Sequence, residues 1–262
     1  MKRIYGILLA TGLFGLSACE KIIIPDLNPG QPRLVIEGGV TNGAGPYTVR
    51  LTRSADYYQP GNPVGVAGAV ITIADDRGKL DTLTYTSNGT YLTKTTKGAV
   101  GRTYTLRVVA GGTTYLASST LPAPVPITRL TYETQQFGKV IYANYTDPAA
   151  ADNYYRWVLY INGQKQPGLF TDSDRLNNGL NTRQPLFSDP NGNGTKIDVG
   201  DRVRVEMQCI DPVVFTYFFA LSQTVGDQNQ AATPANPTSN LSGGALGYFS
   251  AYSVTTDSLT IK

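Results

Sequence analysis

The chain has 262 residues, 41% hydrophobic and 16% charged, with a formal net charge of +3. This length is enough for one large or two ordinary domains, and no basic cluster suggests nucleic-acid binding. The chain has no histidine and only two cysteines. Nucleophilic sites that pair serine or cysteine with histidine are therefore excluded, as are zinc sites built with histidine or with four cysteines.

The N-terminus has the features of a secretory signal. Lys2 and Arg3 precede an apolar run at residues 4–16, which is shorter than the roughly 20 residues that span a bilayer. The run ends in Leu-Ser-Ala-Cys, which resembles the bacterial lipobox, where a lipoprotein signal peptidase cuts before the cysteine. We expect a signal peptide at residues 1–18 and a diacylglycerol thioether on Cys19. The alternatives are an ordinary secretory signal or a cytosolic protein with an apolar start.

Acyl chains on Cys19 would anchor the protein, since two or more chains convert marginal attachment into stable membrane binding. No other segment reaches 18 consecutive apolar residues, so we expect no spanning helix. Loss of Lys2 and Arg3 with the signal lowers the formal net charge to +1. Residues 19–33 contain three prolines and are predicted to be the lipidated tether.

Residues 34–121 read as short strands separated by turns. Period-two alternation places two sets of side chains inward: Tyr47, Val49 and Leu51, then Tyr104, Leu106 and Val108. Gly111 and Gly112 form a hairpin signal. The pattern predicts an all-β sandwich.

Three alternating prolines mark a linker at residues 122–126, because such a segment favours an extended, semi-rigid backbone. A second β-rich domain is predicted at residues 127–262, with strands near 127–133, 139–147, 153–164 and 201–210. Trp157 lies in an apolar strand and is expected in the core. The predicted fold is mainly β, with two sandwich domains and one short helix in the second.

The second cysteine, Cys209, alternates with charged and polar neighbours along a predicted strand. Val203, Val205 and Met207 share its apolar face. We expect a buried, inert thiol; a reactive thiol would require a nearby base, and none is visible in the sequence.

One helix is predicted after this strand. Asp211 is suited to cap it, Pro212 fits its first turn, and Gly226 is suited to end it. Apolar residues recur between them at helical spacing: Val214, Phe218, Leu221 and Val225. The aromatic run in this segment leaves a buried strand as the alternative.

A calcium loop is one interpretation of residues 188–201. Oxygen-bearing side chains alternate there: Asp189, Asn191 and Asn193. The twelfth position is Gly200 rather than the expected glutamate, although Asp198 and Asp201 lie nearby. A plain Asn-Gly turn is the alternative, and no other cofactor is expected.

Aromatic residues in two predicted loops are candidate contacts for a partner or ligand. The candidates are Tyr57 and Tyr58, then Tyr248, Phe249 and Tyr252. Exposed rings supply large contact area at low entropic cost. The alternative is that these rings fold inward against the sandwich.

Carboxylate pairs occur at Asp75–Asp76 and at Asp172 with Asp174. A glycosidase needs two carboxylates across a cleft, whereas these pairs lie in turn-like contexts. We therefore predict no catalytic residues.

Several segments together resemble a Bacteroidota lipoprotein family known only as a domain of unknown function, number 4249. They are Cys19 and residues 34–58, 66–78, 147–157, 200–211 and 236–254. The resemblance implies an outer-membrane lipoprotein, often encoded beside a TonB-dependent receptor, and supplies no catalytic residue. The first half also resembles the immunoglobulin-like, carboxypeptidase-regulatory type of sandwich, a structural module, and the second is expected to be fibronectin-like. Surface-exposed lipoproteins of this phylum often carry an acidic cluster just after the lipidated cysteine, whereas here only Glu20 precedes Lys21. The resemblance therefore does not assign the protein to one leaflet of the outer membrane.

Three functions fit these observations. The first is a non-enzymatic accessory lipoprotein of an outer-membrane complex, docking on a TonB-dependent β-barrel. The second is a stand-alone surface lipoprotein that binds a glycan or a peptide. The third is a carboxylate-dependent hydrolase.

Overall fold

The computed structural model describes residues 32–54, 63–136, 138–149, 152–188, 194–225 and 236–262. The strands of the first half are β1 (Leu34–Thr41), β2 (Thr48–Arg53), β3 (Val70–Asp75), β4 (Leu80–Thr82), β5 (Thr84–Tyr85), β6 (Thr90–Leu92), β7 (Thr103–Ala110) and β8 (Thr113–Thr120). Strands β1, β2, β6 and β5 are hydrogen-bonded in that order, and β4, β3, β7 and β8 form a second sheet. Alternating apolar residues of both sheets share one core, as the sequence predicts.

The second half begins with β9 (Ile127–Gln135), β10 (Gly138–Thr146), β11 (Tyr154–Ile161), β12 (Gln164–Lys165), β13 (Phe170–Ser173), a 3₁₀ turn η1 (Asp174–Leu176), β14 (Asn181–Leu186) and β15 (Arg202–Ile210). It continues with α2 (Pro212–Val225) and ends in β16 (Leu246–Thr260). Strands β14, β10 and β9 form a three-stranded sheet, and β12, β11, β15 and β16 are neighbours in another. A second core fills this half, with Trp157 and Met207 fully buried in it. The prediction of a mainly β fold with a single helix in the second half is confirmed for the described residues.

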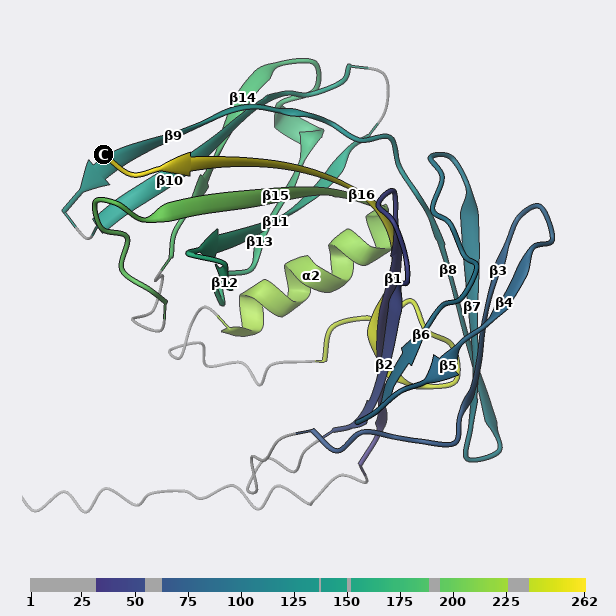
Figure 1. Ribbon diagram of the computed structural model, residues 1–262. Coiled ribbons are helices and arrows are strands. Elements are labelled where there is room, and N and C mark those ends of the chain that lie inside the picture. The colour runs from purple at the N-terminus through teal and green to yellow at the C-terminus, as the bar shows by residue number, and fades with distance from the viewer. Residues whose placement is uncertain (1–31, 55–62, 137, 150–151, 189–193, 226–235) are drawn as a thin grey trace, which may run out of the picture. The chain divides into compact units, whose positions relative to one another are not determined.

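The two halves share a sheet, because β16 is long enough to serve both (Figure 1). Its first part pairs in parallel with β1, and its later part pairs antiparallel with β15. Gly247 lies where β16 meets β1, with φ at +92°, and a Cβ there would lie 2.1 Å from the Ile36 carbonyl oxygen. Only glycine fits this crossing.

The boundary predicted at residues 122–126 lies between the two cores, since Leu121 packs in the first and Val125 in the second. Part of the predicted second domain nevertheless belongs to the first core. Leu241, Ala245 and Phe249 pack there, because β1 requires a hydrogen-bonded neighbour and the start of β16 supplies it.

The helix prediction is confirmed over Pro212–Val225. Asp211 caps it as expected, because its Oδ1 accepts hydrogen bonds from the amides of Val213 at 3.1 Å and Val214 at 2.9 Å. Gly226 lies outside the described residues. Val214 and Phe218 are buried against Ile210 at the base of the helix, which excludes the alternative of a buried strand. No helix in the described part of the chain is long and apolar enough to span a bilayer.

Cys209 is 3% exposed and lies on the same face as Val203, Val205 and Met207, so the predicted buried face is confirmed. Burial raises the pKa of its thiol.

We expect Cys209 to resist a maleimide reagent at neutral pH, because the thiolate that reacts is both disfavoured and covered. In a Cys19→Ser variant Cys209 is the only cysteine, so mass spectrometry counts its labelling directly. Native protein should stay unlabelled while protein in denaturant is labelled fully. Rapid stoichiometric labelling of native protein would contradict the burial.

Candidate functional site

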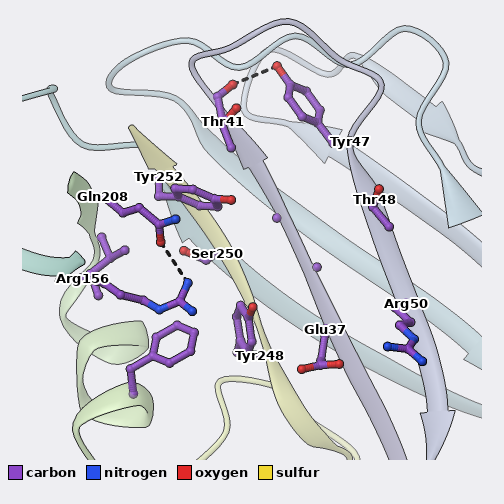
Figure 2. A pocket seen from close by; sticks show the side chains of 14 residues that line it. Glu37, Thr41, Tyr47, Thr48, Arg50, Arg156, Gln208, Tyr248, Ser250 and Tyr252 are labelled. Atoms are coloured by element: carbon purple, nitrogen blue, oxygen red, sulfur yellow. Dashed lines mark hydrogen bonds between the residues drawn. The ribbon is translucent and has the colours of Figure 1, made fainter. Parts of the chain in front are cut away.

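A pocket with a volume of about 370 Å³ opens on one face of the sheet formed by β1, β2 and β16 (Figure 2). Strands β11 and β15 and the helix α2 supply its other wall. The side chains that carry its chemistry are Glu37, Arg50, Arg156, Gln208, Ser250 and the rings of Phe218, Tyr248 and Tyr252. Its volume lies at the lower end for small-molecule sites, so it suits a small ligand or one terminal unit of a polymer.

Strand periodicity explains which residues face this pocket. Tyr248, Ser250 and Tyr252 alternate with Phe249 and Ala251 along β16, and the first three line the pocket while the other two enter the core. The same alternation on β1 turns Glu37 outward beside the buried Ile36.

Gly39 keeps the floor of the pocket open. It is the register partner of Ser250 on β16. A Cβ on Gly39 would lie 2.6 Å from the Ser250 carbonyl oxygen and 2.9 Å from the Tyr252 ring. Any other residue would therefore displace the two strands or this ring.

Arg156 is held from two sides. Its Nη1 donates to Gln208 Oε1 at 3.0 Å, and its guanidinium carbon lies 4.0 Å from the Phe218 ring centroid. Arg156 and Gln208 are also direct cross-strand partners on β11 and β15. The Arg156 Nε is buried and has no hydrogen-bond partner in the protein. The guanidinium is thus fixed in position, with its buried Nε donor unused.

Ser250 presents a second unused polar group. Its side chain is 2% exposed, and its Oγ has no partner in the protein. A buried hydroxyl without a partner costs about 1–3 kcal/mol, so such groups are uncommon unless a ligand or water satisfies them. Here it lines the pocket with Arg156.

Aromatic rings form one wall. The Phe218 and Tyr248 ring centroids are 4.7 Å apart in an edge-to-face arrangement, and Tyr217 lies 5.3 Å from Tyr248. Burial raises the pKa of the Tyr248 hydroxyl, and burial raises that of Tyr252 to about 12. The Tyr217, Tyr248 and Tyr252 hydroxyls are therefore neutral at physiological pH.

Glu37 and Arg50 are cross-strand partners on β1 and β2, and both line the pocket. With Arg156 they give two positive charges and one negative charge in a small volume. This net positive charge favours a negatively charged ligand. The Glu37 carboxylate remains to accept hydrogen bonds from hydroxyl or amine groups of the ligand.

A family model described as Domain of unknown function (DUF4249) matches residues 20–258. The chain belongs to this family. No curated protein matches the chain. The resemblance drawn from the sequence is therefore confirmed at the level of the family.

Two solved structures share limited similarity with this DUF4249 chain. The adhesin InvE of Yersinia pseudotuberculosis is 19% identical, with a TM-score of 0.23, and the match covers 67% of this chain and 55% of the adhesin. A DUF4785 family protein from Legionella pneumophila is 12% identical, with a TM-score of 0.25, and the match covers 68% and 52% of the two chains. The chain thus spans about half the length of each.

The structure separates the aromatic residues predicted to contact a partner or ligand. Tyr248 and Tyr252 line the pocket, but they lie in the strand β16 rather than in a loop as predicted. Phe249 is 0% exposed in the first core. Its predicted role as a surface contact is corrected, because strand alternation points it away from its two neighbours. Tyr57 and Tyr58 lie outside the described residues.

The predicted ion and lipid sites, Asp189, Asn191, Asn193 and Cys19, also lie outside the described residues. Within the described ranges no cluster of three or more metal-ligating side chains occurs. Asp201 Oδ2 accepts from the Asp198 amide at 2.7 Å and its Oδ1 from the Asn162 amide group at 2.8 Å, so this carboxylate stabilises a turn.

The paired carboxylates have structural partners. Asp75 forms an ion pair with Arg102 at 2.6 Å, and Asp76 pairs with the same guanidinium. Asp174 is buried and accepts from the Asn153 amide at 2.8 Å, and Asp172 accepts from the Ser173 amide at 2.8 Å. Burial raises the pKa of Asp172. Asp174 is 3% exposed in the turn η1, so its turn-like context is buried and not solvated.

Sequence reasoning missed Glu37, Arg156, Gln208 and Ser250. A signal existed for Arg156, because it is the one charged residue in the apolar strand β11. A charge that interrupts such a strand points away from the core and often serves a site. Ser250 gave no signal, since a serine among small residues is ordinary in sequence.

A second hollow of about 840 Å³ lies near Lys139, Phe187 and Ile197. None of the described residues that line it carries a buried side-chain polar atom without a hydrogen-bond partner. We therefore place the candidate site at the smaller pocket, where buried donors converge.

Proposed function

We propose that this protein is a non-enzymatic outer-membrane lipoprotein whose pocket binds a small ligand and which acts as an accessory of a TonB-dependent receptor. One observation carries the binding role. The Ser250 hydroxyl, 2% exposed and without a partner, belongs to a residue that lines the same pocket as Arg156, whose Nε is also without a partner. A ligand that accepts from both would remove a destabilising feature of the free protein.

The pocket composition supports binding without catalysis. Glu37 is the only carboxylate among the described residues that line the pocket, whereas glycoside hydrolysis uses two. The chain has no histidine to act as a general base. The remaining polar groups are arginines, hydroxyls and amides, which position a ligand.

The anchoring role rests on Cys19 and the apolar segment before it, and the receptor role rests on the family resemblance. Acylation of Cys19 would hold the protein on the outer membrane while the folded residues reach a neighbouring barrel.

We expect affinity-tagged protein, purified from detergent-solubilised outer membrane, to recover a TonB-dependent β-barrel identified by mass spectrometry. Mass spectrometry of the same sample should show acylated Cys19 and no residues 1–18. A Cys19→Ser variant is the matched control and should lose the membrane fraction and the barrel together. Recovery of the acylated protein without any barrel would contradict the accessory role.

The second candidate is a stand-alone surface lipoprotein that binds a glycan or peptide, and the pocket lined by Arg156, Ser250 and Tyr248 favours it as well. The two candidates differ in whether binding needs the barrel. Ligand affinity that is equal for protein alone and protein in complex would favour the stand-alone function.

A further inference from the structure

Two buried donors in the pocket point to the chemistry of its ligand. Arg156 Nε and Ser250 Oγ are both buried, both unpartnered and both in pocket-lining residues. They come from β11 and β16, strands that β15 separates in the sheet. Residues 156 and 250 are far apart in the sequence, so only the tertiary fold brings these two groups to the same pocket.

We propose that the pocket binds a sugar acid, with its carboxylate on Arg156 and Ser250 and its hydroxyl groups toward Glu37. This assignment rests on the proposed binding function and names its ligand class. The ligand is a free uronic acid or the terminal uronic acid of a polysaccharide.

The carboxylate assignment follows from the guanidinium geometry. Gln208 takes Nη1, and Phe218 packs against the guanidinium face, which leaves the Nε edge for a ligand. A carboxylate binds such an edge with two parallel hydrogen bonds. The Ser250 hydroxyl can donate a third bond to the same group. Because Arg156 is already ordered, binding costs little side-chain entropy.

The rest of the pocket favours a ring that carries hydroxyl groups. Tyr248 and Tyr252 offer ring surface on the same strand face as Ser250. Glu37 accepts hydrogen bonds and cannot donate when ionised, so it suits hydroxyl donors. A peptide C-terminus also carries a carboxylate, and the dipeptide in the test below separates it from a sugar acid.

The lack of a side chain at Gly39 matters for the positions of Ser250 and Tyr252. Gly39 faces Ser250 across the strand pair, and any Cβ there would approach Ser250 and Tyr252 below 3.0 Å. Any other residue at position 39 would therefore displace the β1–β16 strand pair or the Tyr252 ring that lines the pocket.

The test is calorimetric titration of the mature lipidated protein in detergent with galacturonate and glucuronate. The neutral partners galactose and glucose and the dipeptide glycylglycine serve as comparison ligands. We expect each uronate to bind at least about tenfold more tightly than its neutral partner, since a charged hydrogen-bonded contact is worth that factor or more. Saturating uronate should also raise the midpoint of thermal unfolding.

Two variants assign the contacts. Ser250→Ala should weaken uronate binding at least about tenfold while raising the thermal midpoint of the free protein, because it removes a buried hydroxyl without a partner. Arg156→Lys keeps the charge and loses Nε, and it should weaken binding similarly. Ser253→Ala is the matched control, because Ser253 is equally buried on β16 but faces Cys209 instead of the pocket. It should leave affinity unchanged.

The outcomes separate this inference from the proposed function. Neutral sugars that bind as tightly as uronates, or glycylglycine that binds in their place, would overturn the sugar-acid assignment and leave a ligand-binding pocket. Absence of uronate binding would also overturn it. Uronate binding that neither Ser250→Ala nor Arg156→Lys weakens would place the ligand elsewhere and overturn both the assignment and the pocket.

Discussion

Phe249→Ala should lower the free energy of unfolding by about 3–5 kcal/mol, the usual cost of truncating a buried phenylalanine. The Phe249 side chain is 0% exposed and packs in the first core, although it lies on the strand that pairs with both β1 and β15. A cavity at this point weakens the contact between β16 and the first half of the chain. Chemical denaturation followed by fluorescence measures the change.

The matched control is Phe219→Ala. Phe219 is 49% exposed on α2 and stacks on Phe215, so its truncation should cost about 1 kcal/mol or less. Equal losses for the two variants would contradict the placement of Phe249 in the core. A loss of partner binding without a loss of stability in Phe249→Ala would restore its original interpretation as a surface contact.

The strands and the helix with clear periodicity were predictable from sequence. Alternation over residues 203–209 predicted the buried face of β15, and the Asp211 cap with the Pro212 start predicted α2. These signals are local, since each depends on neighbouring side chains and on backbone propensities. The shared core of the first half followed from the same alternation.

The start of β16 was not predictable because its structure depends on a distant partner. Residues 244–253 are rich in glycine and small residues, which is typical of a loop. Parallel pairing with β1, about two hundred residues earlier, makes the segment a strand. The predicted boundary between two domains did not account for this pairing, because the two paired segments are distant in the sequence.

The candidate site was predictable only in part. Exposed aromatic residues drew attention to Tyr248 and Tyr252, but without a strand assignment the opposite orientation of Phe249 stayed hidden. The importance of Ser250 comes from the lack of a hydrogen-bond partner. That property belongs to the folded surroundings, so no sequence pattern records it.

The second large effect is expected at Asp81, on β4. Its carboxylate is 4% exposed, and Oδ2 accepts from the amides of Lys94 at 2.9 Å, Thr95 at 2.7 Å and Thr96 at 2.8 Å, and from the Thr96 hydroxyl at 2.8 Å. Asp81→Ala leaves these donors without an acceptor, and each unsatisfied donor costs about 1–3 kcal/mol of stability. We expect a loss of about 3–5 kcal/mol, because the loop can relax and hydrate some of them.

The effect should extend to the pocket. The Gly98 amide, just beyond the loop held by Asp81, donates to the Tyr47 hydroxyl at 2.9 Å, and Thr93 Oγ1 accepts from the Tyr47 amide at 2.8 Å. Tyr47 lines the pocket. In the Asp81→Ala variant, amide hydrogen exchange should therefore become faster at residues 93–98 and also at Tyr47. The control is Asp152→Ala, at an exposed carboxylate. It should change the free energy of unfolding by no more than about 0.5 kcal/mol.

The pH dependence provides an independent check on Asp81. Burial alone would raise its pKa, but the hydrogen bonds from Thr95, Thr96 and Lys94 outweigh burial and hold the pKa below the usual value of 3.8. The folded protein then binds fewer protons at this site than the unfolded chain, so the stabilisation is present above pH 3.8 and is lost as the pH falls through the lower folded pKa. The difference in free energy of unfolding between wild type and Asp81→Asn should shrink across that range. A difference that stays constant down to the acid transition would show that the charge of Asp81 does not hold the loop.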